Sequence, residues 1–186
     1  VKKGYLYCGT EQGIYLSKND GETWQRFQLN LPIVPITDLC LKQNDLVVAT
    51  QGRSFWILDD RSLLYQMDAS IAQKKLHVFQ PPISYRMNGS QNKHANNEGV
   101  NPPNGVRLLY WLKDITDSTH CSISIFTEKD SLLRTYKNWE TEKEDMLTVE
   151  QGMNQFYWGM FVKGAEKIED MILWNGTVGS YKVPPG

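Results

Sequence analysis

The chain of 186 residues is long enough for one or two domains with hydrophobic cores of their own. Its 20 basic and 21 acidic residues give a formal net charge of −1, so the charge predicts neither a nucleic acid nor an anionic membrane as a partner. Aromatic residues make up 11% of the chain, as is typical of all-β proteins, and no apolar run approaches the roughly 20 residues of a membrane span.

The first 70 residues predict short strands joined by tight turns. Apolar residues alternate with polar ones over runs of five or six residues, and Gly, Asn, Asp and Pro separate the runs. The predicted strands cover residues 5–10, 13–17, 23–28, 37–42, 45–50, 54–58 and 63–67.

Part of this region is an internal repeat. LYCGTEQGIYLS (6–17) recurs 40 residues later as LVVATQGRSFWIL (46–58), and one extra residue after Gly52 aligns residues 14–16 with residues 55–57. A period near 40 with several short strands per unit is typical of β-propeller blades. We therefore expect three strands of one blade and four of the next, which is only part of a propeller, since closure takes at least four blades.

The octet SKNDGETW joins two of the predicted strands. It matches the Asp-box pattern S-x-[DN]-x-G-x-[ST]-W at Ser17, Asn19, Gly21, Thr23 and Trp24. We expect the Ser17, Asn19 and Thr23 side chains to hydrogen-bond to the turn backbone, and Gly21 to take a positive φ. Trp24 is expected to pack inward, so that its replacement by alanine would cost about 3–5 kcal/mol. On this interpretation the five residues serve the fold.

The repeat ends near residue 70. Residues 71–105 are rich in Asn, Gly and Pro towards their end, and they predict a linker and loop. Further strands are predicted at 106–112, 121–127, 132–136, 152–161 and 171–176. Strands at this spacing without helical periodicity indicate a β-sandwich of the immunoglobulin or fibronectin type III kind over residues 106–186. The predicted fold class is thus all-β, with about two propeller blades over 1–70 followed by this sandwich.

No residue is predicted to be catalytic, to bind a metal or to bind a cofactor. An arginine clamp of the sialidase kind is not indicated, because only Arg53 lies near the repeat, with Arg26 and Arg61 at strand ends. Asp59 and Asp60 are neighbours, and on a strand their side chains would point to opposite faces, so we expect them to cap a hairpin turn.

Other chemistry-bearing residues give no motif. The histidines His77, His94 and His120 lack metal-ligand spacing. The odd number of cysteines (Cys8, Cys40 and Cys121) argues against a disulfide framework and predicts buried free thiols.

Two residues are candidates for binding. Trp139, in the charged run KNWETEKE, is the best candidate for an exposed aromatic that stacks on a sugar; its alternative role is to anchor its loop on the sandwich. Arg53 is the second candidate, with an ordinary surface arginine as the alternative.

Residues 6–60 resemble the Asp-box (BNR) propellers of sialidases, sortilin-type receptors and xyloglucanase-type glycoside hydrolases. With GTEQGIYLSKNDGETW, LNLPIVPITDL and DLVVATQGRSFWILDD, followed by NPPNGVRLLYWL and GMNQFYW, the chain is most similar to large secreted bacterial BNR-repeat proteins labelled glycosyl hydrolase or sortilin-like. The second half also resembles the immunoglobulin-like domain of the flagellar hook-capping type. That likeness rests on SISIFTEKDSLLRTY and on G-x-N-x-F-x-W from Gly152 to Trp158.

The resemblance implies a C-terminal segment of an exported protein, whether secreted, periplasmic or on the cell surface. It implies a non-catalytic module that braces the propeller and binds a glycan or a protein, with the remaining blades of the parent chain as partners. Two alternatives stay open: part of a glycoside hydrolase whose catalytic residues lie in other blades, and a sortilin-like peptide-binding scaffold. The strand edge at residues 5–8 also predicts self-association, because unpaired edges recruit other strands.

Overall fold

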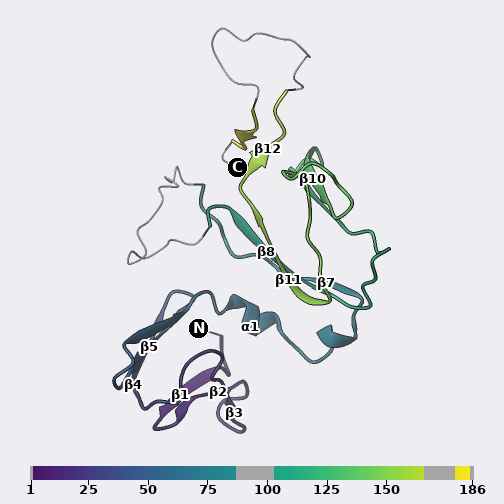
Figure 1. Ribbon diagram of the computed structural model, residues 1–186. Helices are drawn as coiled ribbons and strands as arrows, with labels where there is room; N and C mark the ends of the chain where they lie inside the picture. The colour runs from purple at the N-terminus through teal and green to yellow at the C-terminus, as the bar shows by residue number, and fades with distance from the viewer. Residues whose placement is uncertain (1, 87–102, 166–178, 185–186) are drawn as a thin grey trace. The chain divides into compact units, whose positions relative to one another are not determined.

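The computed structural model describes residues 2–86, 103–165 and 179–184, which form several small antiparallel sheets (Figure 1). The chain divides into two compact units, Val1–Met67 and Asp68–Gly186. Helical structure among the described residues is limited to one short α-helix and one 3-10 turn. The predicted all-β class is therefore confirmed.

The described strands of the first unit form two three-stranded sheets, in the orders β1-β2-β3 and β4-β5-β6. Within each of these sheets, every strand pairs antiparallel with the next one along the chain, as the short turns between them require. The strands are β1 (Leu6–Thr10), β2 (Gly13–Ser17), β3 (Gln25–Arg26), β4 (Ile36–Lys42), β5 (Asp45–Thr50) and β6 (Phe55–Leu58).

One hydrophobic core joins these two sheets. Ile14 of β2 is buried together with Leu46 and Val48 of β5 and with Leu31 from the segment between the sheets. Burying each such side chain stabilises the fold by roughly 1.5–3 kcal/mol. The backbones approach closely at Gly9, where an added Cβ would lie 2.7 Å from Cγ2 of Ile36. The alternating strands thus turn one apolar face of each sheet towards the other.

The strand predicted at residues 63–67 is wrong, because helix α1 (Ser62–Gln66) forms there. Arg61 is the N-cap of the helix and makes no side-chain capping bond. Asp60 before it has a φ of 54°, and its carboxylate accepts the N–H of Ser62 at 3.1 Å. Leucine and glutamine then favour the helix, since they lose little rotamer freedom in it. Asp60 therefore lies just before a helix and not at the hairpin turn expected from the sequence, while Asp59 lies exposed in the preceding irregular segment.

The second unit contains three described sheets, with the strand orders β11-β8-β7, β10-β9 and β12-β13. In Figure 1, β8 and β11 run side by side in the larger sheet. The described elements of the second unit are η1 (Ile71–Gln73), β7 (Leu76–Val78), β8 (Val106–Leu112), β9 (Ser122–Phe126), β10 (Leu132–Lys137), β11 (Gly152–Trp158), β12 (Phe161–Val162) and β13 (Tyr181–Lys182). Strand β7 lies in the range 71–105 that the sequence predicts as linker and loop, so part of that range belongs to a sheet.

Buried side chains in the second unit come from several of these strands. Tyr110 and Leu112 of β8, Tyr136 of β10, Phe79 and Leu147 are all buried. The rings of Tyr136 and Phe156 lie 4.6 Å apart between centroids, so β10 and β11 share an aromatic contact. The strand predicted at 171–176 and residues 87–102 of the predicted linker and loop fall outside the described residues.

The cysteines are free, but they are not buried as predicted. Cys8 and Cys40 are exposed, and Cys121 is partly exposed. Cys8 pairs with Tyr15, and Cys40 pairs with Val47. The residues next to these partners along the strand, such as Ile14, Leu46 and Val48, point into the core. Because side chains alternate along a strand, both cysteines lie on outer sheet faces.

Candidate functional site

The octet SKNDGETW forms the turn between β2 and β3. Ser17 Oγ accepts the N–H of Gly21 at 2.9 Å, and Asn19 Oδ1 accepts the N–H of Thr23 at 3.0 Å. Gly21 has a φ of 93°, a backbone conformation that side chains disfavour. The Thr23 hydroxyl donates to Asn19 Oδ1 at 3.2 Å, to a side chain and not to the backbone. These residues therefore hold the turn through their own hydrogen bonds.

Trp24 does not pack inward as predicted. Its side chain is 44% exposed, and its ring lies over the turn, 3.8 Å from the position of a Cβ built on Gly21. The cost expected for losing a buried aromatic therefore does not apply to it, since much of the ring already contacts water.

The three arginines considered from the sequence have different environments. Arg53 and Arg26 are exposed, and the Arg53 carbonyl accepts the indole N–H of Trp56 at 2.9 Å. Arg61 is 1% exposed and lies at the N-cap of α1, whereas the sequence placed it at a strand end. Nothing described places a carboxylate-binding cluster of arginines around Arg53.

Arg61 joins the helix to the second sheet of its unit. Its Nε donates to the carbonyl of Asn44 and its Nη2 to the carbonyl of Gln43, both at 3.1 Å. Its guanidinium carbon lies 5.7 Å from the ring centroids of Tyr7 and Tyr65, and Nη1 donates to the Tyr65 hydroxyl. Burial raises the pKa of Tyr7 more than the nearby cation lowers it. This cluster is a structural brace that no sequence motif indicated.

Trp139 combines both roles that the sequence suggested. Its side chain is 46% exposed, and its ring stacks on His120 with 4.7 Å between centroids and 26° between planes. Lys137 Nζ lies 5.8 Å from the ring centroid. The indole therefore anchors the loop after β10 to the segment before β9 while part of it stays in contact with water.

A buried ion pair holds the same loop at its other end. The side chains of Arg134 on β10 and of Asp145 are 7% and 11% exposed, and Arg134 Nε donates to Asp145 Oδ1 at 2.6 Å. Glu144 adds a longer contact of 3.4 Å from a largely exposed side chain. Burial is the largest single effect and lowers the pKa of Arg134, but the hydrogen bond to Asp145 and the other neighbouring groups together outweigh it, so the pKa is raised overall. The loop is thus fixed by a pair that sequence spacing did not reveal.

An apolar groove of about 540 Å³ lies between β7, β8 and β9 in the second unit. Leu76 and Val78 of β7 form one side and are more than half exposed, while Ile123 and Ile125 of β9 form the other. Among the described residues, β7 pairs with β8 alone and β9 with β10 alone. Within this part of the chain, the unpaired edges of β7 and β9 therefore flank the groove. His120, which stacks on Trp139, is one of the residues that line it. The full lining is Leu76, Val78, Leu108, Tyr110, Leu112, His120, Cys121, Ser122, Ile123, Ser124, Ile125 and Leu147.

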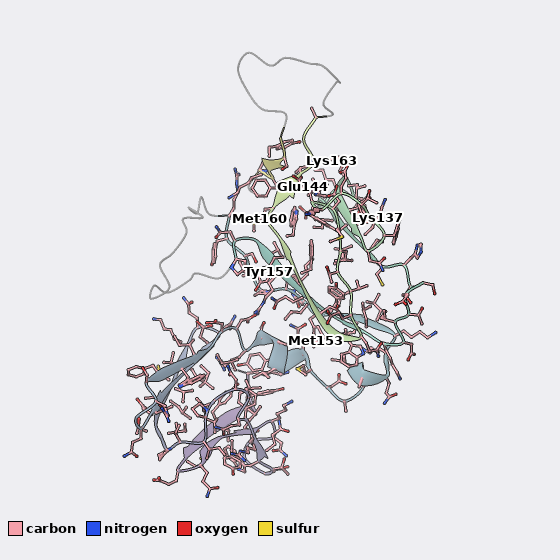
Figure 2. All side chains as sticks on the ribbon, viewed as in Figure 1. Lys137, Glu144, Met153, Tyr157, Met160 and Lys163 are labelled. Atoms are coloured by element: carbon pink, nitrogen blue, oxygen red, sulfur yellow. The ribbon has the colours of Figure 1, made fainter. Side chains whose placement is uncertain are left out.

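A second hollow of about 380 Å³ in the same unit is more polar. Its lining includes Arg134, whose charge is paired with Asp145, and Glu144 and Tyr157, both labelled in Figure 2. Phe156 and Phe161 add aromatic surface. Because its buried cation already has a partner, this hollow offers less unsatisfied chemistry than the apolar groove.

Within the described ranges, no group of three or more His, Cys, Asp and Glu side chains could hold a metal ion. The described helices include none that is long and apolar enough to cross a membrane. No protein-family model matches the chain, and searches of curated proteins and of solved structures also found no match.

Proposed function

We propose that this chain is a non-catalytic interaction module of an exported Asp-box propeller protein, and that its second unit binds an extended protein segment. The observation that supports this function is the apolar groove flanked by the edges of β7 and β9. A strand edge offers a row of N–H and C=O groups that an added strand can pair with. The side chains on one face of that added strand would fill the groove.

The lining favours a protein segment over a glycan. Leucine, isoleucine and valine side chains dominate the groove. A sugar ring would lose hydrogen bonds to water there without regaining them, whereas an extended segment with alternating side chains buries apolar groups and keeps polar ones outside. The exposed part of Trp139 supports a glycan platform as the second candidate, at the edge of this surface.

A peptide selection tests the groove. From random peptides displayed on phage, we expect the whole chain to enrich sequences that alternate apolar and polar residues. Val78→Glu should weaken binding of an enriched peptide by roughly tenfold or more, because it places a charge where apolar surface is buried. Val78 is 58% exposed, so the variant should remain folded.

Lys129→Glu, in the exposed turn between β9 and β10, is the matched control and should leave peptide binding unchanged. Enriched peptides without alternation, or peptides that bind Val78→Glu as tightly as the wild type, would refute strand addition in the groove. If a glycan array gave binding that Trp139→Ala removed, the glycan candidate would replace it.

The glycoside hydrolase alternative concerns other blades of a parent protein. We expect the purified chain to hydrolyse no glycoside, because an acid pair needs two carboxylates that face each other across a cleft. A polysaccharide-hydrolysis screen with the purified chain is the measurement. Turnover that disappears on replacing one of the chain's own acidic residues would overturn the non-catalytic assignment. The sortilin-like alternative predicts peptide binding that depends on the first unit and survives Val78→Glu.

A further inference from the structure

The internal repeat relates the faces of the two sheets in the first unit. Aligning residues 6–17 with residues 46–58 makes positions of β1 and β2 equivalent to positions of β5 and β6. Four of the equivalent pairs belong to one face of each sheet: Tyr7 and Val47, Gly9 and Ala49, Ile14 and Phe55, and Leu16 and Ile57.

In the first sheet, these positions form the face that meets the second sheet. Ile14 and Leu16 are 4% and 1% exposed, and Tyr7 packs against the shared core. Gly9 lies against Ile36 of β4. This face of the first sheet is therefore an interface that the chain itself already fills.

In the second sheet, the equivalent positions lie on the outer face. Val47 pairs with Ile57 and Ala49 with Phe55, whereas the intervening residues of β5 and β6 point to the core. Phe55 is 73% exposed and Ile57 is 60% exposed. The surface that is covered in the first sheet is thus uncovered in the second, and the position of Gly9 again carries a small residue, Ala49.

The opposite faces show the same relation in reverse. In the second sheet, Leu46, Val48 and Trp56 face the first sheet. Their equivalents in the first sheet are Leu6, Cys8 and Tyr15, which lie on its outer face, where Leu6 is 42% exposed and Cys8 is exposed. Each sheet therefore has two different faces, and the contact between the sheets joins one face of the first to the other face of the second. Such a contact between two different surfaces is heterologous.

We propose that the outer face of the β4-β5-β6 sheet, centred on Phe55 and Ile57, binds the outer face of the β1-β2-β3 sheet of a second copy of this chain. The contact repeats the sheet-on-sheet packing inside the first unit, so the side chains on both sides match those of an interface already present. A heterologous contact of this kind is head-to-tail, and it leads to closed rings or to open chains of copies. Phe55 and Ile57 are neighbours on one face of β6, and adjoining exposed apolar side chains of this size are typical of an interaction site.

A mixing experiment tests this contact. Sedimentation equilibrium should show that the average mass of the wild-type chain rises with concentration. Phe55→Glu blocks one face and Leu6→Glu blocks the other, and each should weaken self-association by on the order of tenfold or more. Because both side chains are substantially exposed, circular dichroism should show that both variants remain folded.

An equal mixture of the two variants is the decisive sample. The intact Leu6 face of the Phe55→Glu chain can still bind the intact Phe55 face of the Leu6→Glu chain, so the mixture should form heterodimers and stop there. Phe126→Glu, in the second unit, is the control and should associate like the wild type. A wild-type chain that stays monomeric, a mixture that stays monomeric, or a Phe55→Glu chain that associates normally would each refute the head-to-tail contact.

Discussion

Replacing Arg61 by alanine is expected to lower the free energy of unfolding of the first unit by about 3–5 kcal/mol. The change leaves a cavity beside Tyr7 and Tyr65, and it removes the guanidinium donors to the carbonyls of Gln43 and Asn44. The Asn44 carbonyl still accepts the backbone N–H of residue 61 at 2.7 Å, so the cavity supplies most of the cost. Hydrogen exchange of the β5 amides, followed by mass spectrometry, measures the effect within the first unit.

Arg53→Ala is the matched control, because it removes an arginine whose side chain is exposed. We expect it to change stability by less than about 0.5 kcal/mol. Arg61→Lys should lie between the two, since an ammonium keeps the charge but cannot reproduce the planar fork of donors. If Arg61→Ala and Arg53→Ala gave the same small change, the buried brace would not exist in solution.

Asp145→Ala should destabilise the second unit by about 3–5 kcal/mol, because it leaves the Arg134 guanidinium buried without its carboxylate partner. The loop from β10 to Leu147 should lose protection first, because the Arg134–Asp145 ion pair fixes this loop to β10. Urea unfolding monitored by exchange of the β10 and β11 amides provides the free energy.

Glu144→Ala tests whether the effect belongs to burial or to charge number. Its side chain is 80% exposed and lies 3.4 Å from Arg134, so removing it should cost no more than about 1 kcal/mol. The double variant Arg134→Met, Asp145→Leu removes both charges and should recover most of the stability lost in Asp145→Ala. A Glu144→Ala variant as unstable as Asp145→Ala would contradict the central role of the buried pair.

Part of the candidate site could be predicted from the sequence. Trp139 was identified as an exposed aromatic because a tryptophan in a charged run is unusual, and β9 was expected from its alternation. The groove itself was not predicted, because β7 lies in the range assigned to a linker. Its two sides come from residues 76–78 and 121–125, and no local pattern indicates that such distant segments lie together.

The sequence by itself determined where most strands lie. Strands β2, β5 and β8 have the predicted bounds, because alternation and turn residues act over a few neighbouring positions. The tertiary structure decided which face of each strand is covered. Alternation separates two faces but does not say which one meets another element, so Cys8 and Cys40 are exposed where burial was predicted. Arg61 and Trp24 lie outside the strands, and only the packing around them buries the first and leaves the second 44% exposed. The same reason explains why Leu16 lies in a core and its repeat equivalent Ile57 on a surface: burial depends on what packs above a residue, and that partner is distant in the sequence.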